Sequence, residues 1–117
     1  MNQLFDDPLF NMTAITGGIF FAAGFFMLQF PPKKINFLYG YRTSASMKNQ
    51  DQWDFAQKYA AKEMMLTGLV LATSGLLTLI TDFATSVKLL VGLAMVGLGV
   101  IVLLVRVEKA IKKRFSV

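Results

Sequence analysis

The chain has 117 residues, enough for one domain, and hydrophobic residues make up 55% of it while charged residues make up only 16%. Ordinary soluble domains have roughly 45–50% and 25%. There is no Cys and no His, which excludes disulfides, thiolate or imidazole catalysis and a zinc-type ligand set. We therefore expect no metal site and no other cofactor.

The net charge of +5 is compatible with two classes of partner. A basic domain can bind nucleic acid, but in an apolar chain Lys and Arg more often contact anionic lipid headgroups. Because the mean hydropathy is +0.53, we favour lipid headgroups and expect no direct binding to nucleic acid.

The first uncharged run covers residues 9–30 and predicts a transmembrane helix. At 1.5 Å per residue this run is long enough to cross a hydrocarbon core of about 30 Å. The residues before it, Asp6 and Asp7, are acidic, whereas a signal peptide starts with basic residues, so we expect the segment to remain in the protein. Pro31 and Pro32 end the helix.

Two further apolar runs, residues 64–81 and 88–105, predict a second and a third span joined as an antiparallel hairpin. Eleven of the twelve basic residues lie in the loop 31–63 or the tail 106–117, and Lys88 is the exception. The positive-inside rule places this loop and tail in the cytoplasm and the N-terminus outside. We expect an all-α, multi-pass membrane protein with residues 1–117 as a single domain.

Small residues in the spans indicate where helices approach closely, because lipid provides no hydrophobic drive for association. They are Ala14, Gly18 and Ala22 in the first span, Gly68 and Ala72 in the second, and Gly92, Gly97 and Gly99 in the third. We favour packing within one bundle, and a homo-oligomer interface is the alternative.

The loop predicts a turn followed by a short helix. Gly40 permits the turn, and Asn49 or Ser46 is a suitable N-cap for a helix with Asp51 in its first turn. Beyond this point the residues divide by polarity, with Trp53, Ala56 and Ala60 on one face and Gln50, Asp54, Gln57 and Lys58 elsewhere. We expect a short amphipathic cytoplasmic helix before the second span, with Trp53 at the level of the headgroups.

This loop resembles that of the SdpI family of bacterial membrane proteins. The matching residues are Asn36 after the first span, then Gly40-Tyr41-Arg42-Thr43, then Ser46, and then Trp53 followed three residues later by Ala56. The similarity extends over residues 10–105. Ser44 replaces a proline that is common in the family, and Gln57 stands where the family often has Asn or His.

The resemblance implies a non-enzymatic immunity protein of the bacterial plasma membrane, which protects a producing cell against a secreted, membrane-active toxin peptide. It also implies signalling through a cytoplasmic regulator held at the membrane. The candidate binding residues that it identifies are Asn36, Gly40, Tyr41, Arg42, Thr43, Ser46, Trp53 and Gln57, and no catalytic residue is expected.

Arg42 is well suited to bind a carboxylate or a phosphate. We hypothesise that Asn36, Arg42, Thr43, Ser46 and Trp53 form a polar cytoplasmic cluster beneath the bundle. In the alternative, Arg42 pairs with Asp51 or Asp54 and only folds the loop.

Two other classes of function remain open. A small oligomeric transporter or lipid-handling protein is one, and an enzyme that acts on headgroups through Asp51, Asp54 or Glu63 is the other. The basic tail is best explained as an anchor on anionic lipid, which stabilises by about 1 kcal/mol per charge.

Overall fold

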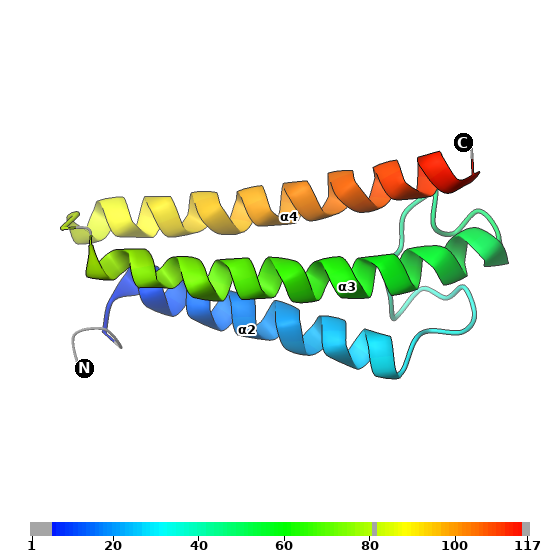
Figure 1. The fold of residues 1–117 in the computed structure, drawn as a ribbon, viewed down its shortest axis with the longest axis horizontal. Helices are drawn as coiled ribbons and strands as arrows, with labels where there is room; N and C mark the ends of the chain where they lie inside the picture. The colour runs from blue at the N-terminus through cyan, green and yellow to red at the C-terminus, as the bar shows by residue number, and fades with distance from the viewer. Residues whose placement is uncertain (1–5, 81, 116–117) are drawn as a thin grey trace.

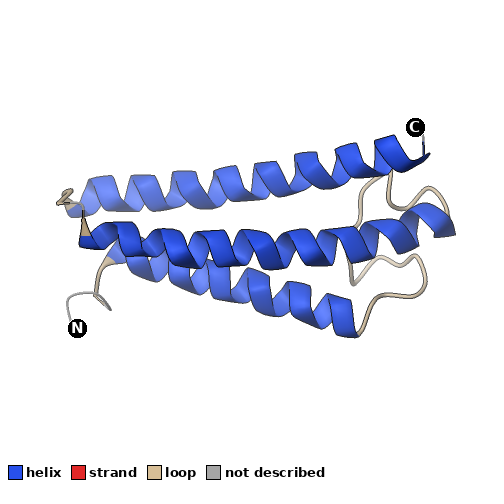
Figure 2. Ribbon diagram, viewed as in Figure 1, coloured by secondary structure: helices blue, strands red, loops and turns tan. Residues whose placement is uncertain are grey.

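Three long helices lie side by side in the computed structural model, which describes residues 6–80 and 82–115 (Figure 1). Helix α2 covers Pro8–Gln29, α3 covers Gln50–Ser74 and continues into the 3-10 helix η1 (Gly75–Leu79), and α4 covers Thr85–Phe115. These residues form helices and loops, with no strand among them (Figure 2). All three helices are long and apolar enough to cross a membrane. The prediction of an all-α fold with three helices long and apolar enough to cross a membrane is confirmed.

Both ends of α2 follow from the local sequence. The Asp7 carboxylate is the N-cap, and its Oδ1 accepts hydrogen bonds from the backbone N–H groups of Leu9 at 3.0 Å and Phe10 at 3.1 Å. Pro8 occupies the first turn, where its missing N–H costs nothing. The helix ends at Gln29, two residues before the Pro31-Pro32 pair.

Helix α3 corrects the prediction of a separate amphipathic helix. Asn49, one of the two predicted positions, is the N-cap, and its side chain accepts a hydrogen bond from the Gln52 N–H at 2.8 Å. From Gln50 the helix continues without a break through the polar stretch up to Glu63 and into the second predicted span. Ala, Gln, Lys and Glu dominate residues 50–63, and no Gly or Pro interrupts the sequence before Gly68, so nothing ends the helix. The predicted end of that span at Thr81 lies outside the described residues, as do the last two residues of the tail 106–117.

The contact between α2 and α3 is made by small residues, although not by the face predicted for the first span. Gly17 is buried against α3, where a Cβ would lie 2.5 Å from the Gly68 carbonyl oxygen and 2.6 Å from the Ala72 nitrogen. Gly18, in contrast, is exposed and meets nothing within 4 Å. The buried positions of α2 recur every three, four or seven residues, so they form one stripe along the helix, and this stripe lies one residue away from the predicted one. The buried residues are Leu9, Thr13, Gly17, Gly24 and Met27.

Helix α4 packs against the other two mainly near its ends. Its buried residues are Gly92 near one end and Leu103, Val107 and Ile111 toward the other. The last three join Ala56 and Ala60 of α3 in the core cluster of the bundle. Of the glycines predicted to be packing positions in this span, Gly97 is exposed and meets nothing within 4 Å.

The bundle has two chemically different ends (Figure 1). At the end that holds the start of α2 and the η1–α4 connection, which we call the hairpin end, Lys88 forms an ion pair with Asp7. The opposite end, which we call the loop end, holds the α2–α3 loop and the C-terminal turns of α4. Lys112, Lys113 and Arg114 lie in the last turn of α4, where they complement the helix dipole.

The glycine contact can be tested with a matched pair of substitutions. Gly17→Ala places a methyl group against the backbone of α3, so we expect it to lower the free energy of unfolding by about 1–3 kcal/mol. Gly18→Ala should leave it unchanged or raise it slightly, because alanine favours helix and the site is open. Unfolding in detergent micelles, followed by circular dichroism, measures both. Equal destabilisation by the two variants would contradict this packing.

Candidate functional site

The α2–α3 loop turns at Gly40, as the sequence predicts. Gly40 has φ of +112°, a conformation that other residues rarely adopt. A Cβ there would also lie 2.6 Å from Oε1 of Gln57 and 2.7 Å from Cγ of Pro32. Before this turn, the Asn36 Oδ1 accepts from the backbone N–H groups of Leu38 at 2.9 Å and Tyr39 at 2.8 Å, as in an Asx turn. Asn36 therefore shapes the loop locally.

Gln57 fastens the loop to α3. Its Oε1 accepts from the Tyr41 N–H at 2.7 Å, and its Nε2 donates to the Tyr41 carbonyl oxygen, also at 2.7 Å. One side-chain amide thus pairs both backbone groups of Tyr41, and the Tyr41 carbonyl also accepts from the Ser46 hydroxyl at 3.0 Å. Gln57 is buried. We expected Gln57 to lie away from the face that Trp53, Ala56 and Ala60 form, and this expectation is wrong.

A polar cluster of five residues joins the loop to α4. We use this name for Tyr41, Thr43, Ser46, Gln57 and Glu108. The Tyr41 hydroxyl donates to Oε2 of Glu108 at 2.8 Å, and the Thr43 hydroxyl donates to the same oxygen at 3.0 Å. Thr43 and Ser46 also satisfy each other, because each hydroxyl oxygen accepts the backbone N–H of the other residue, at 2.8 Å and 3.2 Å. Two motif residues, Tyr41 and Thr43, therefore donate to one carboxylate.

The electrostatics of the polar cluster favour a protonated Tyr41. Burial raises the pKa of the Tyr41 phenol above its ordinary value of 10.0, and the hydrogen bond to Glu108 raises it further. A raised pKa in the folded state stabilises the fold below about pH 10, and this contribution is lost as the pH rises toward the folded-state pKa. The phenol therefore remains a hydrogen-bond donor throughout the physiological range.

Trp53 lies inside the loop end and not at a lipid surface. Its side chain is fully buried, and its Nε1 donates to the Pro32 carbonyl oxygen at 2.7 Å. The predicted face of Trp53, Ala56 and Ala60 is confirmed as a buried face. The prediction that Trp53 is an anchor at the headgroup level is wrong, because the loop folds back over α3 and covers the indole.

Arg42 is exposed, whereas the other seven motif residues are buried or half-buried. Its guanidinium donates to the Phe37 carbonyl oxygen through Nη1. Within the described chain, it forms no ion pair with Asp51 or Asp54, so the alternative reading of the loop is wrong in that detail. The polar cluster hypothesised from the sequence is therefore only partly formed. Thr43 and Ser46 are hydrogen-bonded to each other. Arg42 is exposed, and Asn36 forms its hydrogen bonds within the loop.

Phe37 and Leu38 are 80% and 94% exposed at the tip of this loop. Together with Arg42 they form what we call the loop tip. An aromatic ring, an aliphatic side chain and a permanent cation are thus displayed by a loop that Tyr41 and Thr43 attach to the helices.

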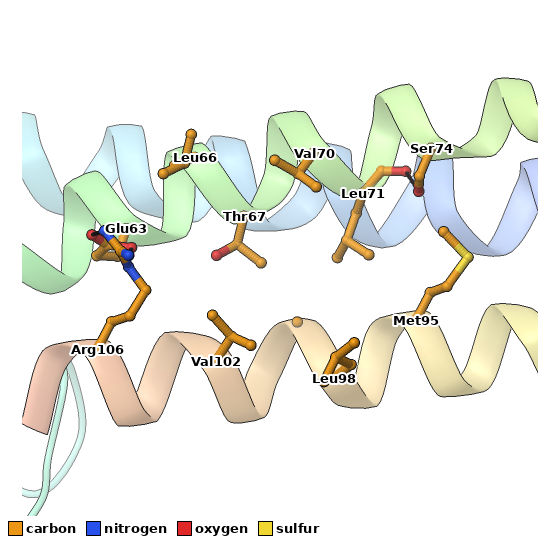
Figure 3. Close-up of a pocket in the computed structure, with 11 residues that line it drawn as sticks. Glu63, Leu66, Thr67, Val70, Leu71, Ser74, Met95, Leu98, Val102 and Arg106 are labelled. Carbon is orange, nitrogen blue, oxygen red and sulfur yellow. Dashed lines mark hydrogen bonds and ion pairs between the residues drawn. The ribbon is translucent and has the colours of Figure 1, made fainter.

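A groove between α3 and α4 is the second feature that could hold a partner (Figure 3). It has a volume of about 350 Å³ and an almost entirely apolar lining: Leu66, Thr67, Val70, Leu71 and Ser74 from α3, and Met95, Leu98, Gly99 and Val102 from α4. Glu63 and Arg106 line its loop end and form a bidentate pair, at 2.8 Å and 2.9 Å.

Sequence reasoning missed two parts of these sites. Glu108 was treated only as part of a basic tail, and its sequence distance from Tyr41 and Thr43 gave no signal of contact. Glu63 and Arg106 could have been found, because each lies at the same membrane boundary of a neighbouring antiparallel span and their charges are opposite.

Comparison with known proteins assigns the loop and the two following helices to one family. The profile of the SdpI/YfhL protein family matches residues 33–106. The protein named uncharacterized protein YfhL from Bacillus subtilis (strain 168) is 49% identical over 63 residues, which cover 54% of this chain and 57% of the relative. The match thus spans little more than half of that relative's length. No solved structure matches.

The polar cluster predicts energetic coupling between Tyr41 and Glu108. Tyr41→Phe and Glu108→Gln should each lower the free energy of unfolding by about 1–3 kcal/mol, because each weakens a hydrogen bond to a charged group. The double variant should lose less than the sum of the two single losses. Unfolding in micelles gives the three values. Tyr59→Phe is the control, since the Tyr59 hydroxyl has no hydrogen-bond partner in the described structure. If the loss in the double variant equals the sum of the losses in Tyr41→Phe and Glu108→Gln, the coupling is contradicted.

Proposed function

Because the chain belongs to the SdpI/YfhL protein family, we propose that it is a non-enzymatic immunity and signalling protein of the bacterial plasma membrane. In this role it protects the cell against a membrane-active toxin peptide. Family membership is the observation that carries the proposal. It rests on a match that covers the loop motif and both later helices, and immunity is what the resemblance to this family implies.

The chemistry of the spans supports binding within the membrane over ion transport. Residues 8–29, 64–74 and 89–105 contain no charged side chain. Ion-coupled transporters place ionisable residues inside their spans, where these residues form the transport path. A bundle with uncharged spans and a lipid-accessible apolar groove instead offers a surface to an apolar or amphipathic partner such as a membrane-active peptide.

The loop tip supports contact with a second partner on the cytoplasmic side. Gln57 and Glu108 hold the loop from both neighbours, so Phe37, Leu38 and Arg42 are displayed on a rigid support. A preorganised loop loses little conformational entropy on binding. We assign contact with a cytoplasmic regulator to this tip and contact with the toxin to the membrane-embedded bundle.

One observation favours a different function, which is lipid handling. The groove between α3 and α4 is apolar and opens toward the bilayer, as a hydrocarbon-binding site would. The alternative of a small oligomeric transporter or lipid-handling protein is therefore included in the test.

Expression in a bacterium sensitive to membrane-active peptides tests the proposal directly. Cells that make the protein should survive a concentration of at least one secreted peptide toxin that kills cells with an empty vector. Growth against a panel of peptides measures this. If no peptide is tolerated although the protein is present in the membrane, and purified protein moves labelled lipid between leaflets of vesicles, lipid handling replaces immunity.

Substitutions in the loop tip separate signalling from folding. Arg42→Ala removes an exposed cation whose described hydrogen bond is to a loop carbonyl, so we expect protein levels to remain unchanged while the toxin-dependent transcriptional response is lost. Lys48→Ala is the matched control, since Lys48 is an exposed cation in the same loop but outside the tip. An equal effect of both variants would contradict a specific role for Arg42.

The proposed orientation puts the loop end in the cytoplasm and the hairpin end outside. The loop end carries eleven of the twelve Lys and Arg residues, and Lys88 at the hairpin end is paired with Asp7. Since the chain has no Cys, Lys48→Cys and Thr85→Cys each create a unique label site. A membrane-impermeant maleimide should label Thr85→Cys in intact cells and Lys48→Cys only after permeabilisation. The reverse pattern would overturn the orientation and the roles assigned to the loop tip.

A further inference from the structure

The apolar groove leads into a second hollow at the loop end, and Arg106 belongs to the lining of both. We call the second hollow the basic pocket. It has a volume of about 630 Å³ and is lined by Phe55, Tyr59, Arg106, Lys109, Ala110, Lys113 and Arg114. The two hollows therefore adjoin at Arg106, and an almost entirely apolar lining meets a cationic one there. Few classes of molecule match both halves.

The residues that line the basic pocket give it a positive charge. Four of its seven lining residues are cationic and none is acidic. On α4, Arg106, Lys109 and Lys113 follow one another at intervals of three and four, so the helix presents these three on one face. Glu63 pairs with Arg106, and Arg114 also lines a hollow that contains Asp51 and Asp54. Lys109 and Lys113 form no ion pair among the described residues.

An aromatic wall on α3 faces these cations. The rings of Phe55 and Tyr59 stack with centroids 5.7 Å apart. The Arg114 guanidinium lies 5.4 Å from the Phe55 ring centroid, within the range of a cation–π interaction. Aromatic residues beside cations are typical of the membrane–water interface, where a headgroup meets the hydrocarbon.

Arg106 is placed to contact an anion without giving up its ion pair. Its Nε and Nη2 donate to the two oxygens of Glu63. Its Nη1 has no hydrogen-bond partner among the described residues, and its side chain is 52% exposed whereas that of Glu63 is 11% exposed. A guanidinium oriented in this way retains donors for a phosphate.

The groove above Arg106 is open to the surrounding lipid. Val70 and Leu98 line it from opposite helices and are 59% and 62% exposed (Figure 3). No charged side chain lines the groove beyond the Glu63–Arg106 pair. An acyl chain that enters sideways from the bilayer meets apolar walls, and the phosphate attached to it lies at the level of Arg106.

We propose that the groove and the basic pocket form one binding site for an anionic phospholipid. One acyl chain lies between α3 and α4, and the phosphate group contacts Arg106, Lys109 and Lys113. The site does not depend on the immunity function proposed above, because it is defined by this geometry and charge.

Native mass spectrometry of the purified protein tests the site, because it counts bound lipids and protein copies in the same measurement. The protein is equilibrated in detergent with equal amounts of phosphatidylglycerol and phosphatidylcholine of the same chain length. We expect one phosphatidylglycerol to be retained preferentially. Equal retention of the two lipids would overturn the proposal.

Two double variants distinguish a site from general attraction to a basic protein. Lys109→Gln with Lys113→Gln should reduce the preference for phosphatidylglycerol about 25-fold, that is, roughly fivefold for each of the two charges removed near the surface. Lys48→Gln with Lys112→Gln removes the same charge outside the basic pocket and should change the preference by less than about twofold, since its charges are solvated and screened. Equal losses would mean diffuse attraction and would overturn the site.

The groove is tested by filling it. Val102→Phe projects a ring into the groove and should lower retention of phosphatidylglycerol, whereas Ile101→Phe places the same ring on a neighbouring exposed position outside the groove lining. Circular dichroism checks that both variants keep their helix content. If Val102→Phe instead changes the number of protein copies and leaves lipid retention intact, a second copy of the chain occupies the groove and the proposal fails.

Discussion

The whole arrangement depends on the close approach of α2 and α3 at Gly17 and Gly68. In lipid, two apolar helices gain nothing from leaving water, so association depends on van der Waals packing of surfaces that fit. Without a side chain at either glycine, backbone meets backbone, and a Cβ at Gly17 would lie 2.5 Å from the facing carbonyl oxygen. Gly24 repeats this contact one heptad later, against the Ala61 carbonyl. These contacts make the helix pair rigid.

Helix α4 is held in a different way, and the difference explains the groove. It is fastened at the hairpin end by the Lys88–Asp7 pair and at the loop end by the Glu63–Arg106 pair and the core cluster. Between Gly92 and Leu103 it has no buried residue among those described. Its middle meets α3 less closely, and side chains of the two helices line the apolar groove there.

The loop end shows how a polar segment is stabilised at a membrane boundary. Buried amide and hydroxyl groups that lose water must find partners, and the Tyr41 backbone finds both of them on Gln57. Glu108 accepts from two hydroxyl groups of the loop, so the loop connects α3 with α4. The motif of the SdpI/YfhL family thus divides into residues that build the loop end and one residue, Arg42, that is displayed by it. This division connects the fold to the proposed signalling role.

The sequence by itself determined the class, the number of long apolar helices, the turn at Gly40 and the family resemblance, because each depends on composition or on residues close together in the chain. It also narrowed the N-cap of α3 to Asn49 or Ser46, and the structure selected Asn49. Only the tertiary structure decided which residues meet. It moved the packing stripe of α2 from Gly18 to Gly17, buried Trp53 and Gln57, and brought Glu108 to Tyr41. A one-residue shift around a helix rotates a face by about 100°, and small residues occur on several faces of these spans. Which face is buried therefore depends on the neighbouring helices, which no local pattern specifies.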